Sequence, residues 1–525
     1  MSSMTFEGRK KRRNGIVRLV FSGLAILLEL TFIIVLFTKL NRYAVWIEAG
    51  TRILAAMLVL GIYSRRQTST IKTPWIILIL AFPIMGVTMY IMVGLNGGTW
   101  KMKARYAALD KALLPLLPAN ADVLEALRGE DPQAAGISSY IANKAHYPLY
   151  HNTDVRYFGE ARDALDSIIS DISKAERYVF MEYHAIEDDK AWARIQKALE
   201  ERVSRGVEVY VFYDDMGSIG FVNMDFAKKL NKAGIRCKVF NPVHPALNLF
   251  LNNRDHRKIT VVDGRVGYVG GFNLANEYFG ITHPYGRWKD TGVRLCGDAV
   301  RSLIISFTEM WNATYGGPDI GWDPIEGTRL QSFLETGAYT ADKPSYVQPY
   351  SDSPMTSEQV GEEVYISIAD KAEKYCWFMT PYLIITDEMS HALSLAAKRG
   401  VDVRIITPGI PDKKLIYSVT RSFYNALVRN GVRIFEWTPG FCHAKMSVSD
   451  DCMATCGTIN MDYRSLYHHF ENACFIADSD VIYDIKADFE KTMAECREVT
   501  EEYGDKRHAY LKLWQLILRL FAGLL

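Results

Sequence analysis

The segment Asn253–Asn273 reads NRDHRKITVVDGRVGYVGGFN. Within it, a histidine is followed by a lysine two positions later and by an aspartate five positions after that. The same spacing returns once, and the two copies are His256, Lys258, Asp263 and His443, Lys445, Asp450. None of the other nine of the eleven histidines is followed in this way. A repeated combination of this kind is a strong signal at ordinary composition.

Each copy predicts a cluster of polar side chains. In a strand, a histidine and a lysine two residues apart point to one face. Gly-Gly or Gly-Thr follows, and then Asn273 or Asn460, and the glycines allow close backbone approach. Two lysines and two amides without paired carboxylates form an anion cradle suited to a phosphate. One histidine can attack phosphorus while the other acts as general acid and then base.

Asp263 and Asp450 have a different expected position. They lie five residues beyond the lysines, which favours side chains that face away from the cradle. Their expected contribution to the catalytic motifs is therefore to hold the local structure.

Other segments repeat at nearly the same offset. RGVDVRIIT at Arg399–Thr407 is similar to RGVEVYVFY at Arg205–Tyr213, and NGVRIFEW at Asn430–Trp437 is similar to AGIRCKVF at Ala233–Phe240. Short β-rich runs alternate with helical stretches of ten or more residues, a pattern typical of parallel strands joined by crossover helices. The chain is therefore predicted to be an internal duplication.

The expected fold is α/β, with two duplicated halves packed face to face about a pseudo-twofold axis. The expected order of regions is an N-terminal membrane region 1–98, a linker 99–150, a first half 151–311, an inter-half linker 312–350, a second half 351–505 and an amphipathic C-terminal helix 506–525.

Three apolar runs near 19–38, 44–63 and 75–95 each approach the length of about 20 residues that spans a bilayer. They predict an integral, multi-pass protein of the cell membrane. Pro83 would kink the third helix. The basic run Arg9–Arg13 favours a cytoplasmic N-terminus. If two segments span the membrane, the large domain lies on the same side as the N-terminus. If three segments span it, the large domain lies on the other side. For the C-terminal helix, the pattern favours an amphipathic helix at the membrane interface, with docking on the domain as the alternative.

Composition excludes some classes. The 61 basic and 60 acidic residues nearly cancel, so no basic field predicts nucleic acid as a partner. The eight cysteines include no C-x2-C pair, which makes a disulfide framework or a zinc ribbon unexpected. No metal site and no cofactor are predicted.

The paired motifs resemble the HKD motifs of the phospholipase D superfamily, and the chain is most similar to bacterial cardiolipin synthases over nearly its whole length. Besides the apolar N-terminus and the amphipathic C-terminus, the stretches that carry the resemblance are Tyr213–Ser218 (YDDMGS), Gly270–Tyr278 (GGFNLANEY), Thr380–Tyr382 (TPY) and Asn460–Ser465 (NMDYRS). Two departures are Thr458, where the superfamily often has serine, and the pair His468-His469, for which the sequence offers no account.

The resemblance implies a phosphatidyl transfer without metal. His256 would attack the phosphorus of phosphatidylglycerol and form a phosphatidyl-histidine. His443 would protonate the departing glycerol and then deprotonate a hydroxyl of a second phosphatidylglycerol, which gives cardiolipin; the order of the two histidines is open. The residues expected to hold the phosphate oxygens are Lys258, Lys445, Asn273 and Asn460. Asp290 and Glu471 are expected to orient the histidines, with surface carboxylates as the alternative.

Other functions use the same residues. A membrane-anchored phospholipase D would pass the phosphatidyl group to water, and another phosphatidyltransferase would pass it to a different alcohol. A nuclease fits the apolar N-terminus and neutral charge poorly. A non-catalytic scaffold does not explain two intact motifs. The sequence indicates neither the acyl preference nor the oligomeric state.

Overall fold

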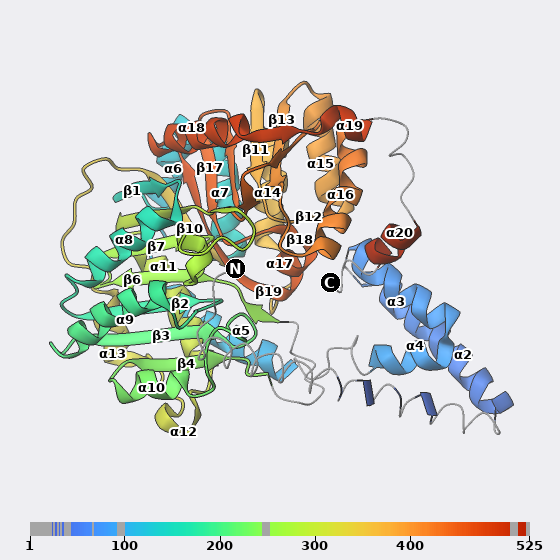
Figure 1. The fold of residues 1–525 in the computed structure, drawn as a ribbon, viewed down its shortest axis with the longest axis horizontal. Helices are drawn as coiled ribbons and strands as arrows, with labels where there is room; N and C mark the ends of the chain where they lie inside the picture. The colour runs from blue at the N-terminus through green and yellow to red at the C-terminus, as the bar shows by residue number, and fades with distance from the viewer. Residues whose placement is uncertain are drawn as a thin grey trace.

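The computed structural model describes residues 24, 27–28, 31, 34–35, 44–65, 68–91, 100–243, 253–504 and 513–520. Figure 1 shows a body of two sheets with helices packed around them, and a separate group of N-terminal helices beside it. One buried apolar cluster includes side chains of both halves, such as Phe180 and Phe378, so the two halves share a core.

The first half is built on a seven-stranded sheet with the order β1-β9-β7-β6-β2-β3-β4. Neighbours β2, β3 and β4 are parallel, and every other pair is antiparallel. The strands are β1 (Thr153–Phe158), β2 (Tyr178–Tyr183), β3 (Glu208–Asp214), β4 (Arg236–Phe240), β6 (Lys258–Val262), β7 (Val266–Gly270) and β9 (Gly292–Gly297). Its helices are α8 (Ala161–Ile172), α9 (Lys190–Val203), α10 (Phe226–Lys232), η4 (Asn276–Phe279) and α11 (Val300–Ala313).

The second sheet repeats this order position by position as β10-β19-β17-β16-β11-β13-β14, with β20 added at the edge. The strands are β10 (Tyr346–Asp352), β11 (Tyr375–Met379), β13 (Asp402–Pro408), β14 (Arg433–Trp437), β16 (Met446–Ser449), β17 (Met453–Gly457), β19 (His469–Ala477) and β20 (Cys496–Glu498). The helices are α14 (Val360–Lys371), α15 (Asp387–Lys398), α16 (Lys414–Val428), α17 (Tyr463–His468), α18 (Val481–Ala494) and α19 (Thr500–Gly504), and the short strands β12 (Leu383–Ile384) and β18 (Met461–Asp462) pair with each other. The shared order confirms the predicted duplication.

The prediction of parallel strands is confirmed for β2, β3 and β4 and for β11, β13 and β14. The remaining strands of each sheet are antiparallel to their neighbours. The chain turns back directly between β6 and β7, where Asp263 and Gly264 both have positive φ (54° and 71°). Asp450 and Asp451 do the same between β16 and β17 (52° and 62°). Two consecutive residues of this kind form a tight hairpin turn, which can join only antiparallel strands.

The two halves exchange short strands. β5 (Arg254–Asp255) pairs with β19 of the second half, and β15 (Gly440–Cys442) pairs with β8 (Arg287–Lys289) of the first half. The exchange is reciprocal: each half gives the other one short strand, and each of these strands comes just before a histidine motif. This is the relation expected of the predicted pseudo-twofold axis.

Two segments expected to be linkers belong to the folded body. The segment 99–150 forms α5 (Trp100–Leu113), η3 (Leu114–Leu116), α6 (Ala121–Glu130) and α7 (Pro132–Lys144). Leu127 and Ile141 lie fully buried in the shared core. The segment 312–350 contains α12 (Gly317–Ile320), α13 (Gly327–Leu334) and the first residues of β10. Its glycine residues lie in loops or at helix ends, whereas Pro349 lies within β10.

The N-terminal helices differ from the expected spans. The predicted 44–63 helix is α2 (Ala44–Tyr63), whereas the predicted 75–95 helix is divided into α3 (Ser69–Ala81) and α4 (Pro83–Met89), because Pro83 starts a new helix. Most of 19–38 lies outside the described residues. Within the described ranges, the structure contains no helix that is both long and apolar enough to cross a membrane.

The C-terminal segment contains α20 (Leu513–Leu520), and the rest of 506–525 lies outside the described residues. Figure 1 shows α20 (dark red) beside α3, away from the sheets. α20 also contacts α16: the Arg519 guanidinium lies 4.1 Å from the Phe423 ring centroid, and Gln515 Nε2 donates to Ser418. The docked position is therefore the one observed.

Candidate active site

The two motif histidines lie at the junction of the halves. The sequence suggested that each motif histidine lies within a strand. In the structure His256 lies between β5 and β6, and His443 lies between β15 and β16, so each histidine comes just before a regular strand. The backbone N–H of His256 donates to Phe470 O (2.8 Å), and that of His443 donates to Lys289 O (2.8 Å). Each histidine is thus fixed by the backbone of the opposite half.

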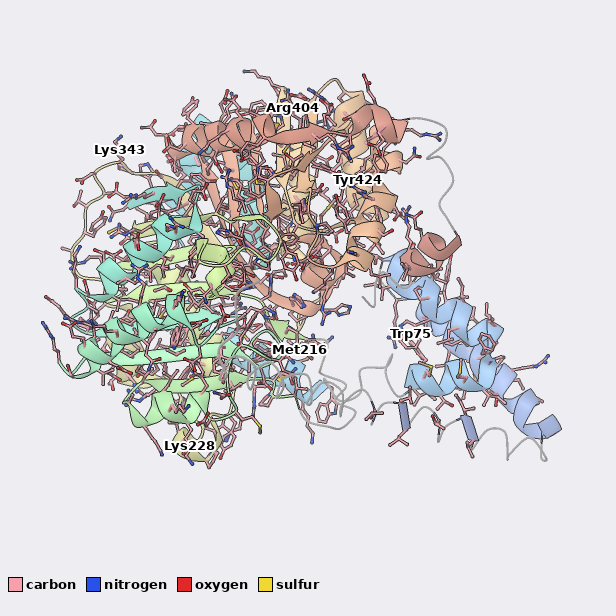
Figure 2. The ribbon with its side chains drawn as sticks, viewed as in Figure 1. Trp75, Met216, Lys228, Lys343, Arg404 and Tyr424 are labelled. Carbon is pink, nitrogen blue, oxygen red and sulfur yellow. The ribbon has the colours of Figure 1, made fainter. Side chains whose placement is uncertain are left out.

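A cavity of about 680 Å³ opens between the histidines. Its lining includes His256 and His443, Asn273 and Asn460, and other side chains from both halves. Met216 also lines it, and Figure 2 shows this residue on the side of the body toward α3, where Trp75 is labelled. The structure therefore brings four of the predicted site residues to one cavity.

The orienting carboxylates come from the opposite halves. His256 Nδ1 lies 2.9 Å from both carboxylate oxygens of Glu471, and His443 Nδ1 lies 2.6 Å from Asp290 Oδ2. Both carboxylates are fully buried. A carboxylate at Nδ1 holds the proton there and leaves Nε2 with its lone pair toward the cavity. The motif histidine of the same half is not the partner of either carboxylate, and the strand exchange brings each carboxylate to the motif histidine of the other half.

The carboxylates are held in turn by hydroxyl and amide groups. Thr458 Oγ1 and Ser465 Oγ donate to Glu471, and the Thr291 N–H donates to Asp290 Oδ1 at 2.9 Å. The hydroxyl at position 458, where the sequence departs from the usual serine, thus has a direct structural task.

The lysines lie beneath the histidines. Lys258 and Lys445 are almost fully buried, and neither forms part of the cavity lining. Lys258 Nζ donates to His256 O (2.6 Å), and Lys445 Nζ lies 2.6 Å from His443 Nδ1. The lysines place positive charge behind the imidazoles, although their ammonium groups contact protein atoms in this structure.

Burial sets the protonation of the site. It lowers the pKa of His256 well below its usual value, with a further contribution from Lys258. Burial and then Lys445 lower the pKa of His443 to about 3. Burial also lowers the pKa of Lys258 to about 7 and that of Lys445 to about 8, because a charged amine is desolvated there. Both imidazoles are therefore neutral near pH 7, the form needed by a nucleophile and by a base.

The two asparagines differ in their hydrogen bonds. Asn273 accepts from the Ala185 N–H (3.1 Å) and donates to the Tyr278 hydroxyl (2.8 Å). The Oδ1 atom of Asn460 is buried and has no hydrogen-bond partner within the described part of the chain. Asn460 therefore has the greater capacity for a new contact in the cavity.

Asp263 and Asp450 lie outside the cavity lining and are not brought together. The Asp263 carboxylate accepts from the backbone N–H groups of Glu176, Arg177 and Tyr178 at 2.8–2.9 Å. Asp450 does the same at the corresponding turn, where it accepts from residues 373, 374 and 375. The motif aspartates fix the entry of β2 and β11 and do not contact the histidines in this structure.

Sequence reasoning missed several residues around the histidines. His184 and His469 lie beside His256, with ring centroids 5.0 and 5.3 Å away. Trp288 and Tyr278 lie beside His443, with ring centroids 5.4 and 5.3 Å away. His469 and Trp288 each come two positions before an orienting carboxylate, so the period-two spacing of strands could have identified both.

One set of side chains has the composition of a metal site. Among the described residues, donor atoms of His256, His469 and Glu471 lie within 4.8 Å of one another. However, Arg464 Nε donates to His469 Nε2 at 3.1 Å. An imidazole that accepts at one nitrogen keeps its proton on the other, so the set fits a hydrogen-bonded network better than a set of metal ligands.

The sequence of this chain is similar to those of known proteins. The family model described as cardiolipin synthase, PLD-like domain, matches residues 168–285 and 365–493, one match in each half. An uncharacterized protein of Streptococcus mutans is 40% identical over 88% of this chain and 98% of its own length. Cardiolipin synthase 2 of Bacillus cereus is 30% identical over 89% of both chains.

The fold has a solved counterpart. The crystal structure of phosphatidylserine synthase from Haemophilus influenzae covers 75% of this chain and 98% of its own, with a TM-score of 0.53 at 14% identity. The two matched halves, the repeated motifs and the relatives agree. This chain belongs to the cardiolipin synthase family of phospholipase D-like proteins.

Proposed function

We propose that this protein is a cardiolipin synthase that transfers a phosphatidyl group between two molecules of phosphatidylglycerol. His256 Nε2 attacks the phosphorus of the first lipid, and the phosphorus–oxygen bond to the glycerol headgroup breaks. His443 takes up a proton on Nε2 when the phosphate anion enters the cavity, because a nearby anion favours the charged form of an imidazole, and this proton goes to the departing glycerol oxygen. The terminal hydroxyl of the second lipid then attacks phosphorus, its proton passes to His443 Nε2, and the bond to His256 breaks.

The observation that carries this proposal is the reciprocal pairing of His256 with Glu471 and of His443 with Asp290. Two imidazoles with fixed tautomers face one cavity. A double displacement needs both of them: one as nucleophile, and one as acid and then base.

The electrostatics support a phosphate as the reacting group. Lys258 and Lys445 lie behind the two histidines, and Asn273 and Asn460 line the cavity. An incoming phosphate would favour the charged form of both amines, because an anion raises the pKa of a neighbouring ammonium group. We propose these four residues as the phosphate-binding set. Asp263 and Asp450 then act only through the backbone turns that they hold.

Residues 151–311 and 351–505 are proposed as the two catalytic halves of a single enzyme unit. The N-terminal region is proposed to hold this unit at the cell membrane, where its lipid substrates lie. Exposed apolar side chains on α2 and α3 support membrane contact, among them Ile53, Met57, Leu60 and Leu80. A multi-pass arrangement of the segments 19–38, 44–63 and 75–95 is the expectation from sequence.

The test uses the full chain reconstituted in vesicles that contain phosphatidylglycerol. Wild type should form cardiolipin and release one glycerol per cardiolipin, and His256→Ala and His443→Ala should not. Phosphatidic acid without cardiolipin would identify a hydrolase instead. Cardiolipin formation by His256→Ala at the wild-type rate would remove the catalytic assignment.

A further inference from the structure

The surroundings of the two histidines are related by the exchanged strands but differ in chemistry. In the β8–β15 pair, Trp288 lies opposite Phe441, next to His443. In the β5–β19 pair, His469 lies opposite Arg254, next to His256. Trp288 thus takes the place at His443 that His469 takes at His256. The fold repeats, so this difference belongs to the side chains and points to different tasks.

The His443 side of the cavity has an aromatic wall, in which Tyr278 and Trp288 line the cavity and the buried Phe441 packs against Trp288. The ring centroids of Tyr278, Trp288 and Phe441 lie 5.3, 5.4 and 5.8 Å from that of His443. The Trp288 ring also contacts Tyr278 (4.6 Å) and Phe441 (4.9 Å). These contacts hold the three rings in one rigid group.

One polar atom of this wall lacks a partner. Trp288 Nε1 is buried and has no hydrogen-bond partner among the residues that the structure describes. The indole N–H can only donate, and buried indole groups usually have an acceptor. By contrast, the Tyr278 hydroxyl already accepts from Asn273. The Tyr278 hydroxyl keeps its own hydrogen and can also donate. Of the two donors in this wall, the indole N–H is therefore the one that has no partner among the described residues.

The chemistry at His443 limits what this molecule can be. In the proposed function, on which this inference rests, His443 exchanges a proton with the terminal oxygen of a glycerol headgroup. The secondary hydroxyl of the same glycerol lies one carbon away and enters the cavity with it. Its oxygen needs a donor to replace the water that it loses.

We propose that Trp288 and Tyr278, with Phe441 packed against Trp288, form a subsite for a vicinal diol, the glycerol headgroup of phosphatidylglycerol, in which the indole N–H of Trp288 donates to the secondary hydroxyl. The rings exclude water from the acceptor position, and the hydrogen bond directs the terminal hydroxyl toward phosphorus. The bond from that oxygen to phosphorus forms as the phosphorus–nitrogen bond to His256 breaks, and the hydroxyl proton goes to His443.

The test is a competition between two small acceptors. The full-length enzyme receives vesicles of phosphatidylglycerol with equal concentrations of deuterated glycerol and 1,3-propanediol, which lacks the secondary hydroxyl. Mass spectrometry gives the ratio of deuterated phosphatidylglycerol to phosphatidylpropanediol, which reports the ratio of kcat/KM for the two alcohols. Wild type should prefer glycerol.

Trp288→Phe keeps the aromatic ring and removes the donor. It should reduce the preference for glycerol by about 2- to 10-fold, the range expected for one hydrogen bond, while transfer to 1,3-propanediol continues. Trp288→His restores a ring N–H and should recover part of the preference. The matched control is His469→Phe, the corresponding position at His256, which should leave the ratio at its wild-type value.

Three results would overturn the subsite: no preference in wild type, an unchanged ratio in Trp288→Phe, or an equal loss of preference in His469→Phe. If wild type modifies neither alcohol and forms no cardiolipin, the proposed function itself fails. This result differs from the three results above, in which transfer continues and only the diol subsite is refuted.

Discussion

The pairing of each histidine with the carboxylate of the other half predicts which step each carboxylate supports. Asp290 follows His256 in sequence but contacts His443. Asp290→Asn should therefore impair the acid–base function. Glu471→Gln should impair the nucleophile, because Glu471 contacts His256.

The size of the Asp290→Asn effect follows from its hydrogen bonds. Both carboxylate oxygens accept, one from His443 Nδ1 at 2.6 Å and one from the Thr291 N–H at 2.9 Å. Asparagine has one acceptor oxygen, so one of the two donors would face an N–H group. Loss of a hydrogen bond to a charged group costs about 1.5–3 kcal/mol, which corresponds to a roughly 10- to 150-fold lower rate of cardiolipin formation.

A phosphatidyl donor with p-nitrophenol as leaving group separates the two steps. Nitrophenolate leaves without protonation, so the first step no longer needs His443 as an acid. Asp290→Asn and His443→Ala should still release a burst of about one nitrophenolate per enzyme. Glu471→Gln should give a slower burst, and His256→Ala should give none.

The opposite pattern would refute this reasoning. If His443→Ala keeps the burst but Asp290→Asn loses it, the assignment of Asp290 to His443 is wrong. If His256→Ala keeps the burst and His443→Ala loses it, the roles of the two histidines are reversed. Asp450→Asn is the control for a carboxylate change in the same fold, and its burst should match that of wild type.

Three further outcomes follow from the geometry. Asp263→Asn and Asp450→Asn should each lower the free energy of unfolding by about 1–3 kcal/mol in urea titrations and leave the rate per folded molecule unchanged, because each carboxylate holds three backbone N–H groups; a normal stability would contradict this. The pKa of His443 is about 3 in the folded protein, below the ordinary value of about 6.5, so the unfolded chain binds the proton first and wild type loses stability as the pH falls from about 7 toward 3. His443→Gln should therefore lose about 2 kcal/mol less than wild type between pH 7.5 and pH 5, and parallel curves would disprove the burial effect. Competitive inhibition by inorganic vanadate should weaken as the pH rises from 7 to 9, because Lys258 and Lys445, with pKa values of about 7 and 8, lose their charge; inhibition that is constant over this range would exclude them from anion binding.

Local patterns predicted the duplication and much of the site. The spacing of His256 and Lys258, and its repeat at His443 and Lys445, fixed the composition of the cluster. The alternation of strands and helices predicted α/β halves, and both sheets have the same order. Such features depend on neighbours along the chain, where the spacing of side chains is set by the backbone.

The sequence did not predict which residues far apart in the chain contact one another. Nothing in the residues around Asp290 indicates that it contacts His443, because this contact depends on how β8 and β15 meet in space. Asp263 and Asp450 were expected to hold local structure, but the motif did not indicate that each one holds the entry of a strand more than seventy residues earlier. The packing of 99–150 against the core was likewise hidden, because a mixed helical stretch gives no sign of which surface it covers.

The reciprocal exchange of β5 and β15 also bears on the origin of the chain. A single ancestral half would have carried one histidine and one carboxylate that cannot reach each other. Two identical copies, associated through a self-complementary interface, would have completed both pairs at once. Fusion of the two copies into one chain would have freed each from the need to match the other. The difference between Trp288 and His469 is the kind of divergence that such a fusion permits.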